Sequence, residues 1–172
     1  IYVASNNVGG NTSVNYLEEA FYSANSVKKV DNSANITLFT DQKINNKGGV
    51  FTNIKVVNMS LRCKQEILLL SPYEKTILLD TDTYVNHSIL DLFQLLDKYE
   101  ILGVPDYSRK RILDIKEYME IPYGFSEINS GMLAFKKCEK LILLYNLWNS
   151  YYKKYKNVTP WDQPSFRIAL WE

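Results

Sequence analysis

Two carboxylates follow one apolar run in the middle of the chain. The run Thr76–Leu79 ends directly at Asp80, and a single residue, Thr81, separates Asp80 from Asp82. In an extended segment, residues at i and i+2 point to the same face, so the two carboxylates would lie side by side. Anions this close repel each other unless a cation lies beside them, and Mg²⁺ and Mn²⁺ commonly bridge protein carboxylates to phosphates. The spacing therefore indicates a metal held against a pyrophosphate.

The same two residues have a purely structural interpretation. Aspartates at the end of a strand often stabilise the turn that follows, or cap the next helix. A D-x-D tripeptide alone does not decide between this interpretation and a metal site, so the surrounding elements matter.

Apolar periodicity predicts strands and helices that alternate along the chain. The predicted strands cover residues 1–5, 36–40, 51–59, 76–79, 101–104 and 128–135, and the predicted helices cover 13–27 (with Ser13 as its cap), 61–70, 89–96, 138–156 and 160–171. This order predicts an α/β fold over residues 1–172, a Rossmann-like single domain with a mainly parallel central sheet. In such folds ligands bind beyond the carboxyl ends of the strands, where Asp80 and Asp82 would lie.

Residues 106–127 show no clear period and predict a long mobile loop with a short helix. Loops of this length are usually functional or disordered. The basic residues Arg109, Lys110 and Arg111 could close over a diphosphate as a lid, or form an ordinary solvated loop.

Composition excludes several other classes of function. Twenty basic and 19 acidic residues leave a net charge of +1, which gives no electrostatic basis for nucleic-acid binding. Two cysteines and one histidine cannot build a disulfide framework or a Cys/His zinc cluster. The aliphatic runs Ile67–Leu70 and Leu141–Leu144 are far shorter than a membrane span. The chain begins inside a strand-like run without Met, so it is expected to be a fragment of a longer protein.

Four blocks in the same order resemble one enzyme family. The residues around Asp80 and Asp82, from Lys64 to Phe93, resemble the central block of GT-A glycosyltransferases. The most similar group is the retaining family 8, the glycogenin-like and bacterial galactosyltransferase-like enzymes. Three further blocks fit this family: Val104–Asp106, Ile128–Met132 (INSGM) and Trp161–Gln163 (WDQ). Together they span about residues 60–165, and four ordered blocks are far more specific than one.

The resemblance implies a metal-dependent transfer of a sugar from a nucleotide-diphospho-sugar, a UDP-sugar in most of the family, with retention at the anomeric carbon. The acceptor would be a glycan or a protein-linked glycan. Asp80 and Asp82, with Thr81 between them, would coordinate Mn²⁺ or Mg²⁺.

The family also suggests roles for the remaining candidate residues. Those expected to hold the base and ribose are Ala4, Ser5, Asn6 and Asp41; those expected to contact the donor diphosphate or sugar are Lys64, Asp106, Asn129 and Ser130. Asp162 and Gln163 would lie near the anomeric carbon, stabilising the transition state or acting as nucleophile. Structural alternatives are a surface lysine for Lys64, a turn residue for Asn129, close packing for Gly131 and a helix cap for Asp162.

The sequence also departs from the family. Its third metal ligand is a histidine in a C-terminal stretch that this chain lacks, and the single histidine here, His87, lies in a predicted turn. One alternative is therefore a catalytically degenerate domain that binds sugar nucleotides. Another is a haloacid-dehalogenase-like phosphatase, although Tyr84 occupies a position where that motif has Thr or Val. A sugar-nucleotide pyrophosphorylase would need a basic residue in the loop after the first strand, which residues 6–10 lack.

Overall fold

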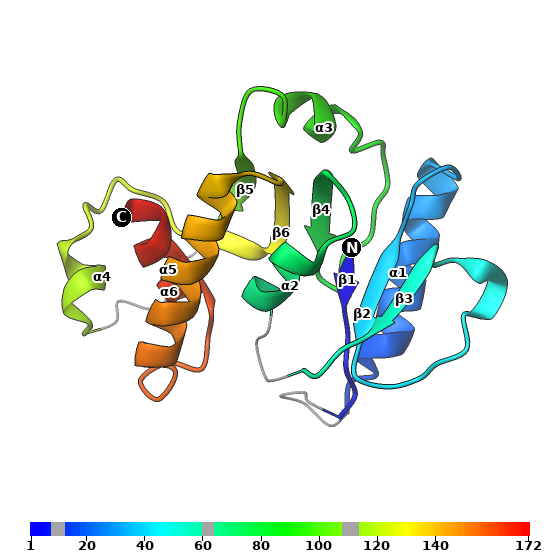
Figure 1. The fold of residues 1–172 in the computed structure, drawn as a ribbon, viewed down its shortest axis with the longest axis horizontal. Coiled ribbons are helices and arrows are strands. Elements are labelled where there is room, and N and C mark those ends of the chain that lie inside the picture. Colours follow the sequence, from blue (N-terminus) through cyan, green and yellow to red (C-terminus); the bar gives the residue numbers. More distant parts are fainter. Residues whose placement is uncertain (8–12, 60–63, 108–113) are drawn as a thin grey trace.

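The computed structural model describes residues 1–7, 13–59, 64–107 and 114–172. Strands and helices alternate as predicted (Figure 1). The elements are β1 (Tyr2–Val3), α1 (Tyr16–Val30), β2 (Thr37–Thr40), a 3₁₀ helix (Lys47–Gly49), β3 (Asn53–Val56), α2 (Lys64–Leu70), β4 (Lys75–Leu79), α3 (Asp91–Leu95), β5 (Ile101–Pro105), α4 (Lys116–Glu120), β6 (Ile128–Lys136), α5 (Glu139–Tyr155) and α6 (Gln163–Trp171). The predicted lid residues 109–111 lie outside the described residues.

The strands form two three-stranded sheets. The first has the order β1-β2-β3 and is parallel, whereas in the second, β4-β6-β5, the central strand β6 runs antiparallel to both neighbours. Backbone hydrogen bonds connect the two sheets, because the Leu79 amide donates to the Ile1 carbonyl oxygen at 3.1 Å. The prediction of a mainly parallel sheet thus holds for the first sheet but is wrong for the pairing in the second.

The reversal of β6 decides where the candidate residues lie. Because β4 and β5 both run antiparallel to β6, they point in the same direction, and the start of β6 lies beside their carboxyl ends. Residues after β4, residues after β5 and the first residues of β6 therefore share one edge.

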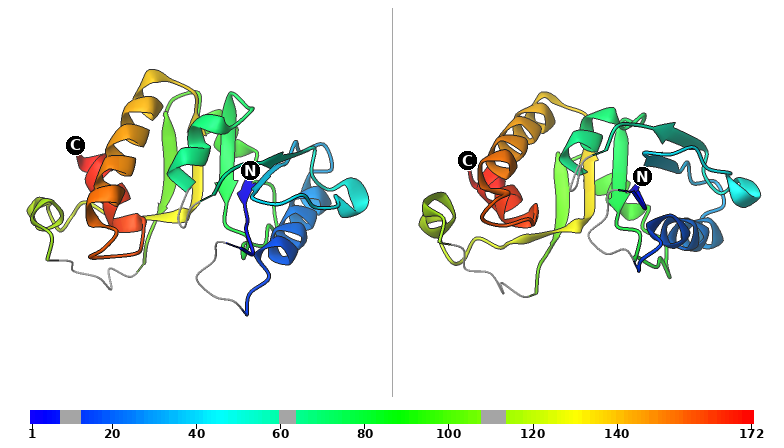
Figure 2. Two further views of the ribbon diagram at one scale, coloured as in Figure 1. Left: turned by 60° about the horizontal axis from the view of Figure 1, so that its bottom comes forward. Right: turned by 90° about the horizontal axis from the view of Figure 1, so that it is seen from below.

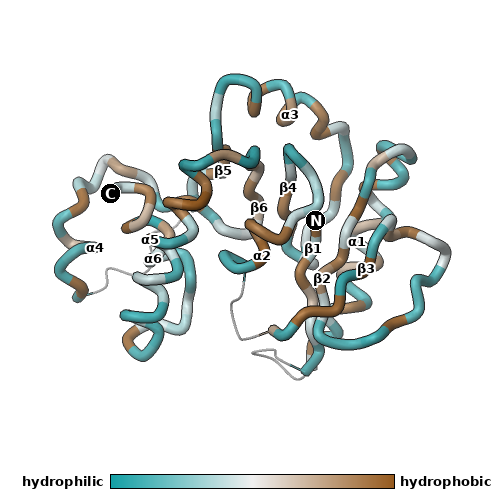
Figure 3. Tube along the Cα trace, viewed as in Figure 1, coloured by the Kyte–Doolittle hydropathy of each residue, from teal (hydrophilic) through white to brown (hydrophobic). Residues whose placement is uncertain are grey.

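Alternating side chains of the strands build a core on each face of the sheets. In β4, Ile77 and Leu79 join the core that contains α1, whereas Leu78 joins the core that contains α2, α5 and α6. In β2, Leu38 and Phe39 divide in the same way. This is the two-residue period of a strand covered by helices on both faces. Figure 2 shows the second sheet between α1 and the pair α5 and α6, and Figure 3 shows hydrophobic stretches along several strands and α2.

Helix boundaries agree with the predictions to within a few residues, with one correction. The cap of α1 is Asn15, whose side chain accepts a hydrogen bond from the Glu18 amide at 3.2 Å, and not Ser13. Both residue types cap helices well, so their identities alone cannot select the position. Among the described residues no helix combines the length and apolarity needed to cross a membrane.

Candidate active site

A bulge in β6 separates Ser130 and Gly131 from the neighbouring strand β5. Gly103 of β5 pairs with Leu133, but the next residue, Val104, pairs with Asn129, so Ser130–Met132 have no partner on β5. A Cβ atom on Gly103 would clash with Cγ2 of Ile128 in the bulged strand. Bulges redirect side chains beside active sites, and this one presents residues 129–131 to the ends of β4 and β5.

Asp80 lies directly against this bulge. Its amide donates to the Gly131 carbonyl oxygen at 2.7 Å, and the Gly131 amide donates to Oδ1 of Asn129 at 2.7 Å. A Cβ atom at position 131 would lie 2.7 Å from Asp80 Oδ2 and 2.8 Å from Asn129 Oδ1. Gly131 therefore provides the space in which both side chains lie, which agrees with the close-packing interpretation of this glycine.

Lys64, at the start of α2, points into the same place. Its Nζ forms an ion pair with Oδ1 of Asp80 and donates to the Ser130 carbonyl oxygen at 3.3 Å. Its side chain is only 14% exposed, so Lys64 is not an ordinary surface lysine. The Lys64 ammonium thus contacts both the end of β4 and the bulge of β6.

Asp162 is a buried carboxylate with one unpaired oxygen. It is 3% exposed, Oδ1 accepts from the Ser130 hydroxyl at 3.3 Å, and Oδ2 is buried without a hydrogen-bond partner among the described residues. Trp148 of α5 holds the backbone, because its Nε1 donates to the Asp162 carbonyl oxygen at 3.0 Å. Asp162 occupies the N-cap position of α6, but its side chain caps no amide in the described chain. The helix-cap interpretation thus describes the backbone and leaves the carboxylate unexplained.

Gln163 is held by two carboxylates. Its Nε2 donates to Oδ2 of Asp106 at 2.7 Å and to Oε1 of Glu127 at 2.9 Å. The Asp106 amide in turn donates to the Glu127 carbonyl oxygen at 2.7 Å. Sequence reasoning missed Glu127, which is 6% exposed. Its place two residues before Asn129 was the available signal, but nothing in the pattern shows that it is buried.

A second polar group lies at the carboxyl ends of β1 and β2. Ser5 donates to Oδ2 of Asp41 at 2.7 Å, while Asp41 Oδ1 and Thr40 Oγ1 are buried without hydrogen-bond partners in the described chain. Asn6 is exposed and donates to Oδ1 of Asn15 at 2.8 Å. Ala4 is 2% exposed and belongs to the core beside α1, so its side chain is packed in the interior.

The two residues after Asp80 differ in their environment. Thr81 donates from Oγ1 to Oε2 of Glu19 on α1 at 2.8 Å. Asp82 is exposed and makes no hydrogen bond or ion pair with the described residues. His87 is also exposed. The carboxylate of Asp82 is therefore available for a ligand.

The side chains around Asp80 offer ligands for a divalent cation. Asp80 and Asp82 supply the oxygen ligands that Mg²⁺ and Mn²⁺ prefer, and the ammonium of Lys64 already lies against Asp80, where a positive charge is stabilised. In the described chain no group of three His, Cys, Asp or Glu side chains forms a complete cage. The residues thus fit an open site, in which phosphate and water oxygens complete the coordination.

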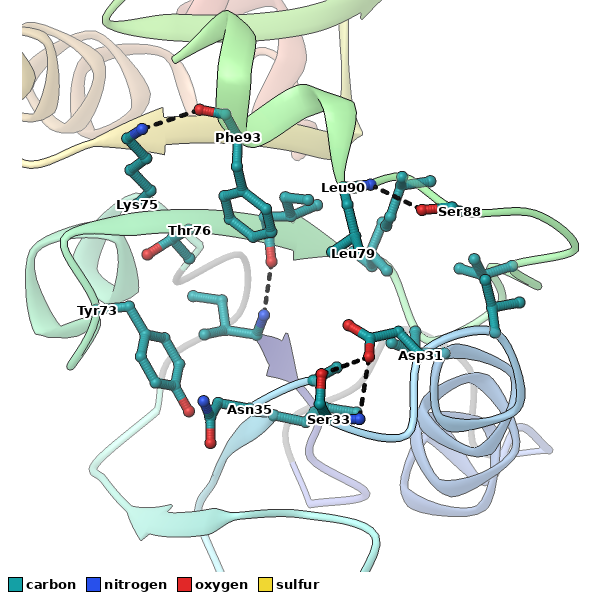
Figure 4. Close-up of a pocket in the computed structure, with 18 of the residues that line it drawn as sticks. Asp31, Ser33, Asn35, Tyr73, Lys75, Thr76, Leu79, Ser88, Leu90 and Phe93 are labelled. Carbon is teal, nitrogen blue, oxygen red and sulfur yellow. Dashed lines mark hydrogen bonds between the residues drawn. The ribbon is translucent and has the colours of Figure 1, made fainter. Parts of the chain in front are cut away.

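One cavity lies elsewhere. It has a volume of about 320 Å³ and is lined by residues near the amino ends of β2 and β4, including Ile36, Tyr73 and Thr76 (Figure 4). The candidate residues follow the carboxyl ends of the same strands. We assign the site by its buried polar groups, because none of the candidate residues lines this cavity.

No protein-family model and no curated protein matches the sequence. The fold, in contrast, is similar to solved glycosyltransferases. A crystal structure of the galactosyltransferase LgtC in complex with donor and acceptor sugar analogues has a TM-score of 0.68 at 16% identity, over 98% of this chain and 69% of LgtC. An active-site mutant of LgtC has a TM-score of 0.67 at 17% identity, over 98% of this chain and 68% of LgtC. The apo form of the glycosyltransferase GlyE of Streptococcus pneumoniae has a TM-score of 0.67 at 15% identity, over 97% of this chain and 41% of GlyE. The α/β fold is thus one that these glycosyltransferases share.

Proposed function

We propose that the chain is the catalytic core of a metal-dependent glycosyltransferase that takes a sugar from a nucleotide-diphospho-sugar, a UDP-sugar, and transfers it to a glycan or protein-linked glycan with retention. The donor nucleotide and the stereochemistry follow from the family resemblance of the four sequence blocks. The acceptor class follows from the same resemblance, and the polar groups at the sheet edge support the metal and the donor site.

One observation carries this proposal: contacts join several of the candidate residues that come from distant parts of the sequence. Lys64 links Asp80 to Ser130, and Ser130 links to Asp162. The neighbouring residue Gln163 then links to Asp106. A merely structural role for each residue would not require them to meet at one edge.

Unpaired buried oxygens mark where a ligand would bind. A buried polar group without a hydrogen bond costs on the order of 1–3 kcal/mol, and a charged one costs more. Such atoms lie at both ends of the site, at Thr40 and Asp41 on one side and at Asp162 on the other. We assign the first pair to the ribose and base of the donor, and Asp162 Oδ2 to the sugar.

Asp80 and Asp82 would hold Mn²⁺ or Mg²⁺, with diphosphate oxygens of the donor as further ligands. When bound, the metal supplies positive charge that neutralises the leaving diphosphate. Lys64 adds a second positive charge near that group, and its ion pair with Asp80 keeps the carboxylate oriented.

In the transfer, the bond between the anomeric carbon and the diphosphate oxygen breaks, and its electron pair stays with the diphosphate. The acceptor oxygen forms the new bond to the anomeric carbon, and its proton passes to the departing diphosphate oxygen. Positive charge develops at the anomeric carbon, and a preorganised carboxylate in a buried site stabilises such charge strongly. Asp162 is suited to this role because its Oδ2 is buried and uncommitted.

Calorimetric titration tests the proposal. UDP, GDP and their common sugar conjugates are titrated into the protein with and without Mn²⁺, and release of free sugar or transfer to glycan acceptors is then followed with the nucleotide that binds. We expect metal-dependent binding of UDP and of one UDP-sugar. Failure of every nucleotide to bind to the folded protein would contradict the proposal, and phosphatase activity that depends on Asp80 would replace it.

A further inference from the structure

A buried carboxylate that the proposed transfer does not use lies behind Gln163. Glu127 is 6% exposed and precedes β6 directly. Its two oxygens have separate partners: Oε1 accepts from Gln163 Nε2 at 2.9 Å, and Oε2 accepts from the Tyr118 hydroxyl at 2.5 Å. Glu127 therefore connects a candidate catalytic side chain to the helix α4.

These contacts fix the orientation of the Gln163 amide. Its NH₂ group donates to two carboxylates, those of Asp106 and Glu127. A flipped amide would set its carbonyl oxygen against two anionic acceptors, which cannot donate. The NH₂ group must therefore face the carboxylates, and the carbonyl oxygen faces away from them.

Tyr118, the second partner of Glu127, is itself held in place. The guanidinium of Arg167 lies 4.7 Å from the centre of the Tyr118 ring. It donates to the carbonyl oxygens of Tyr118 at 3.3 Å, Pro122 at 3.1 Å and Phe125 at 3.0 Å. Arg167 is only 2% exposed, so its buried guanidinium holds the backbone of the segment from Tyr118 to Phe125. Tyr118 consequently donates to Glu127 from a constrained position.

We propose that Glu127 is a positioning residue, which holds the Gln163 amide so that its carbonyl oxygen is presented to the donor sugar during transfer. This inference rests on the proposed function, because it names what sets the geometry of that same site. Glu127 itself touches neither donor nor acceptor. Misplacing a reacting group by about 1 Å can cost roughly 100-fold in rate, so the loss of this support should appear mainly in kcat.

Two substitutions separate the effect of side-chain length from the effect of charge. Glu127→Gln keeps the length of the side chain and removes its charge. The carbonyl oxygen of the new side chain can accept a hydrogen bond from Gln163, and its NH₂ group can donate one to the Tyr118 hydroxyl. Glu127→Asp keeps the charge but is one methylene shorter. We expect Glu127→Gln to keep kcat within about 3-fold of wild type and Glu127→Asp to lower it roughly 10- to 100-fold, with the donor KM within about 3-fold in both. Glu120→Asp is the matched control, because it makes the same change at an exposed glutamate of α4 that is ion-paired with Lys116, and we expect it to keep the kcat of wild type.

The opposite order, with Glu127→Asp active and Glu127→Gln inactive, would overturn the inference, because charge and not position would then matter. A loss of UDP affinity that parallels kcat in Glu127→Asp would also overturn it. A second measurement does not depend on enzymatic activity. It is the exchange of the Gln163 side-chain NH₂ protons with solvent, measured by NMR. We expect faster exchange in Glu127→Asp than in wild type, and equal exchange would contradict the inference. If wild type binds no nucleotide while this difference persists, the proposed function alone fails.

Discussion

A single methyl group added at Gly131 tests whether Asp80 must lie where the structure has it. In Gly131→Ala, the new Cβ would be 2.7 Å from Asp80 Oδ2, so that oxygen would have to retreat by about 0.7 Å to reach an ordinary contact of 3.4 Å. Asp80 cannot retreat freely, because Lys64 binds its other oxygen and its amide is bonded to the carbonyl of residue 131. The carboxylate must therefore turn away from the bulge.

We expect Gly131→Ala to weaken ligand binding and to change the free energy of unfolding much less. Overpacking costs about 1–3 kcal/mol in a core, but the Asp80 side chain is 38% exposed and can shift toward solvent, which favours the lower value. Alanine also lowers the conformational entropy of the unfolded chain, which stabilises the folded state by about 0.4–1 kcal/mol. The Tm should therefore change by no more than about 4 °C. Changes in the surroundings of a metal ligand typically cost about 10- to 100-fold in affinity, and we expect Mn²⁺-dependent UDP affinity to fall by that factor.

The assay is calorimetric titration of UDP with and without Mn²⁺, together with thermal unfolding. Gly124→Ala is the matched control, because a Cβ at Gly124 would meet no atom within 4 Å. We expect the control to bind as wild type does. Unchanged Mn²⁺-dependent affinity in Gly131→Ala would refute the reasoning, since Asp80 would then tolerate displacement or would not hold the metal.

Three other substitutions test separate parts of the structure. Asp82→Asn should abolish the gain in UDP affinity on adding Mn²⁺ and leave the Tm unchanged, since Asp82 is exposed; calorimetry that still shows the full gain would exclude Asp82 as a ligand. Asp162→Asn should lower kcat by at least about 100-fold with little change in donor affinity, in keeping with the loss of an electrostatic group at the reacting centre; a collapse of donor binding with normal turnover of bound donor would make Asp162 structural. Hydrogen bonds from Lys154 and Tyr155 lower the pKa of Glu117 from 4.5 to about 2. Glu117 therefore stabilises the fold above pH 4.5, and this contribution disappears as the pH falls toward 2. Glu117→Gln should lower the Tm at pH 7 slightly, with a difference from wild type that shrinks below pH 4.5, and a difference independent of pH would contradict this.

The order and type of the elements were predictable because each apolar run has a clear period. The residues around Asp80 illustrate this, since a wholly apolar run before two carboxylates predicts a buried strand and its end. The direction of β6 was not predictable from its own residues, because an apolar strand carries no local signal for parallel or antiparallel pairing. Its bulge depends on Gly103 of another strand, which meets Ile128 only in the folded chain.

The candidate site was predicted unevenly for the same reason. Short motifs identified Asp80, Ser130 and Asp162, and the structure brings these residues together. Their roles in binding and transfer stay predictions. Glu127 was missed because its burial results from Tyr118 and Gln163, which are distant in sequence. The side chain of Ala4 packs in the core, which a strand pattern of five residues cannot reveal, and its predicted contact with the donor stays a prediction.

The reversed strand β6 also has a consequence for the order of folding. The hydrogen bonds that assemble one end of the site need residues 130, 162 and 163, whereas the strands of the first sheet pair within residues 2–56. Because synthesis proceeds from the N-terminus, contacts within residues 2–56 can form before residues 130–163 have been made. During synthesis Ser5 and Asp41 can therefore meet early, whereas Ser130 and Asp162 can meet only after the chain has been made as far as α6. A donor that touches both ends stabilises only the finished fold, so the substrate itself would favour complete folding of the chain.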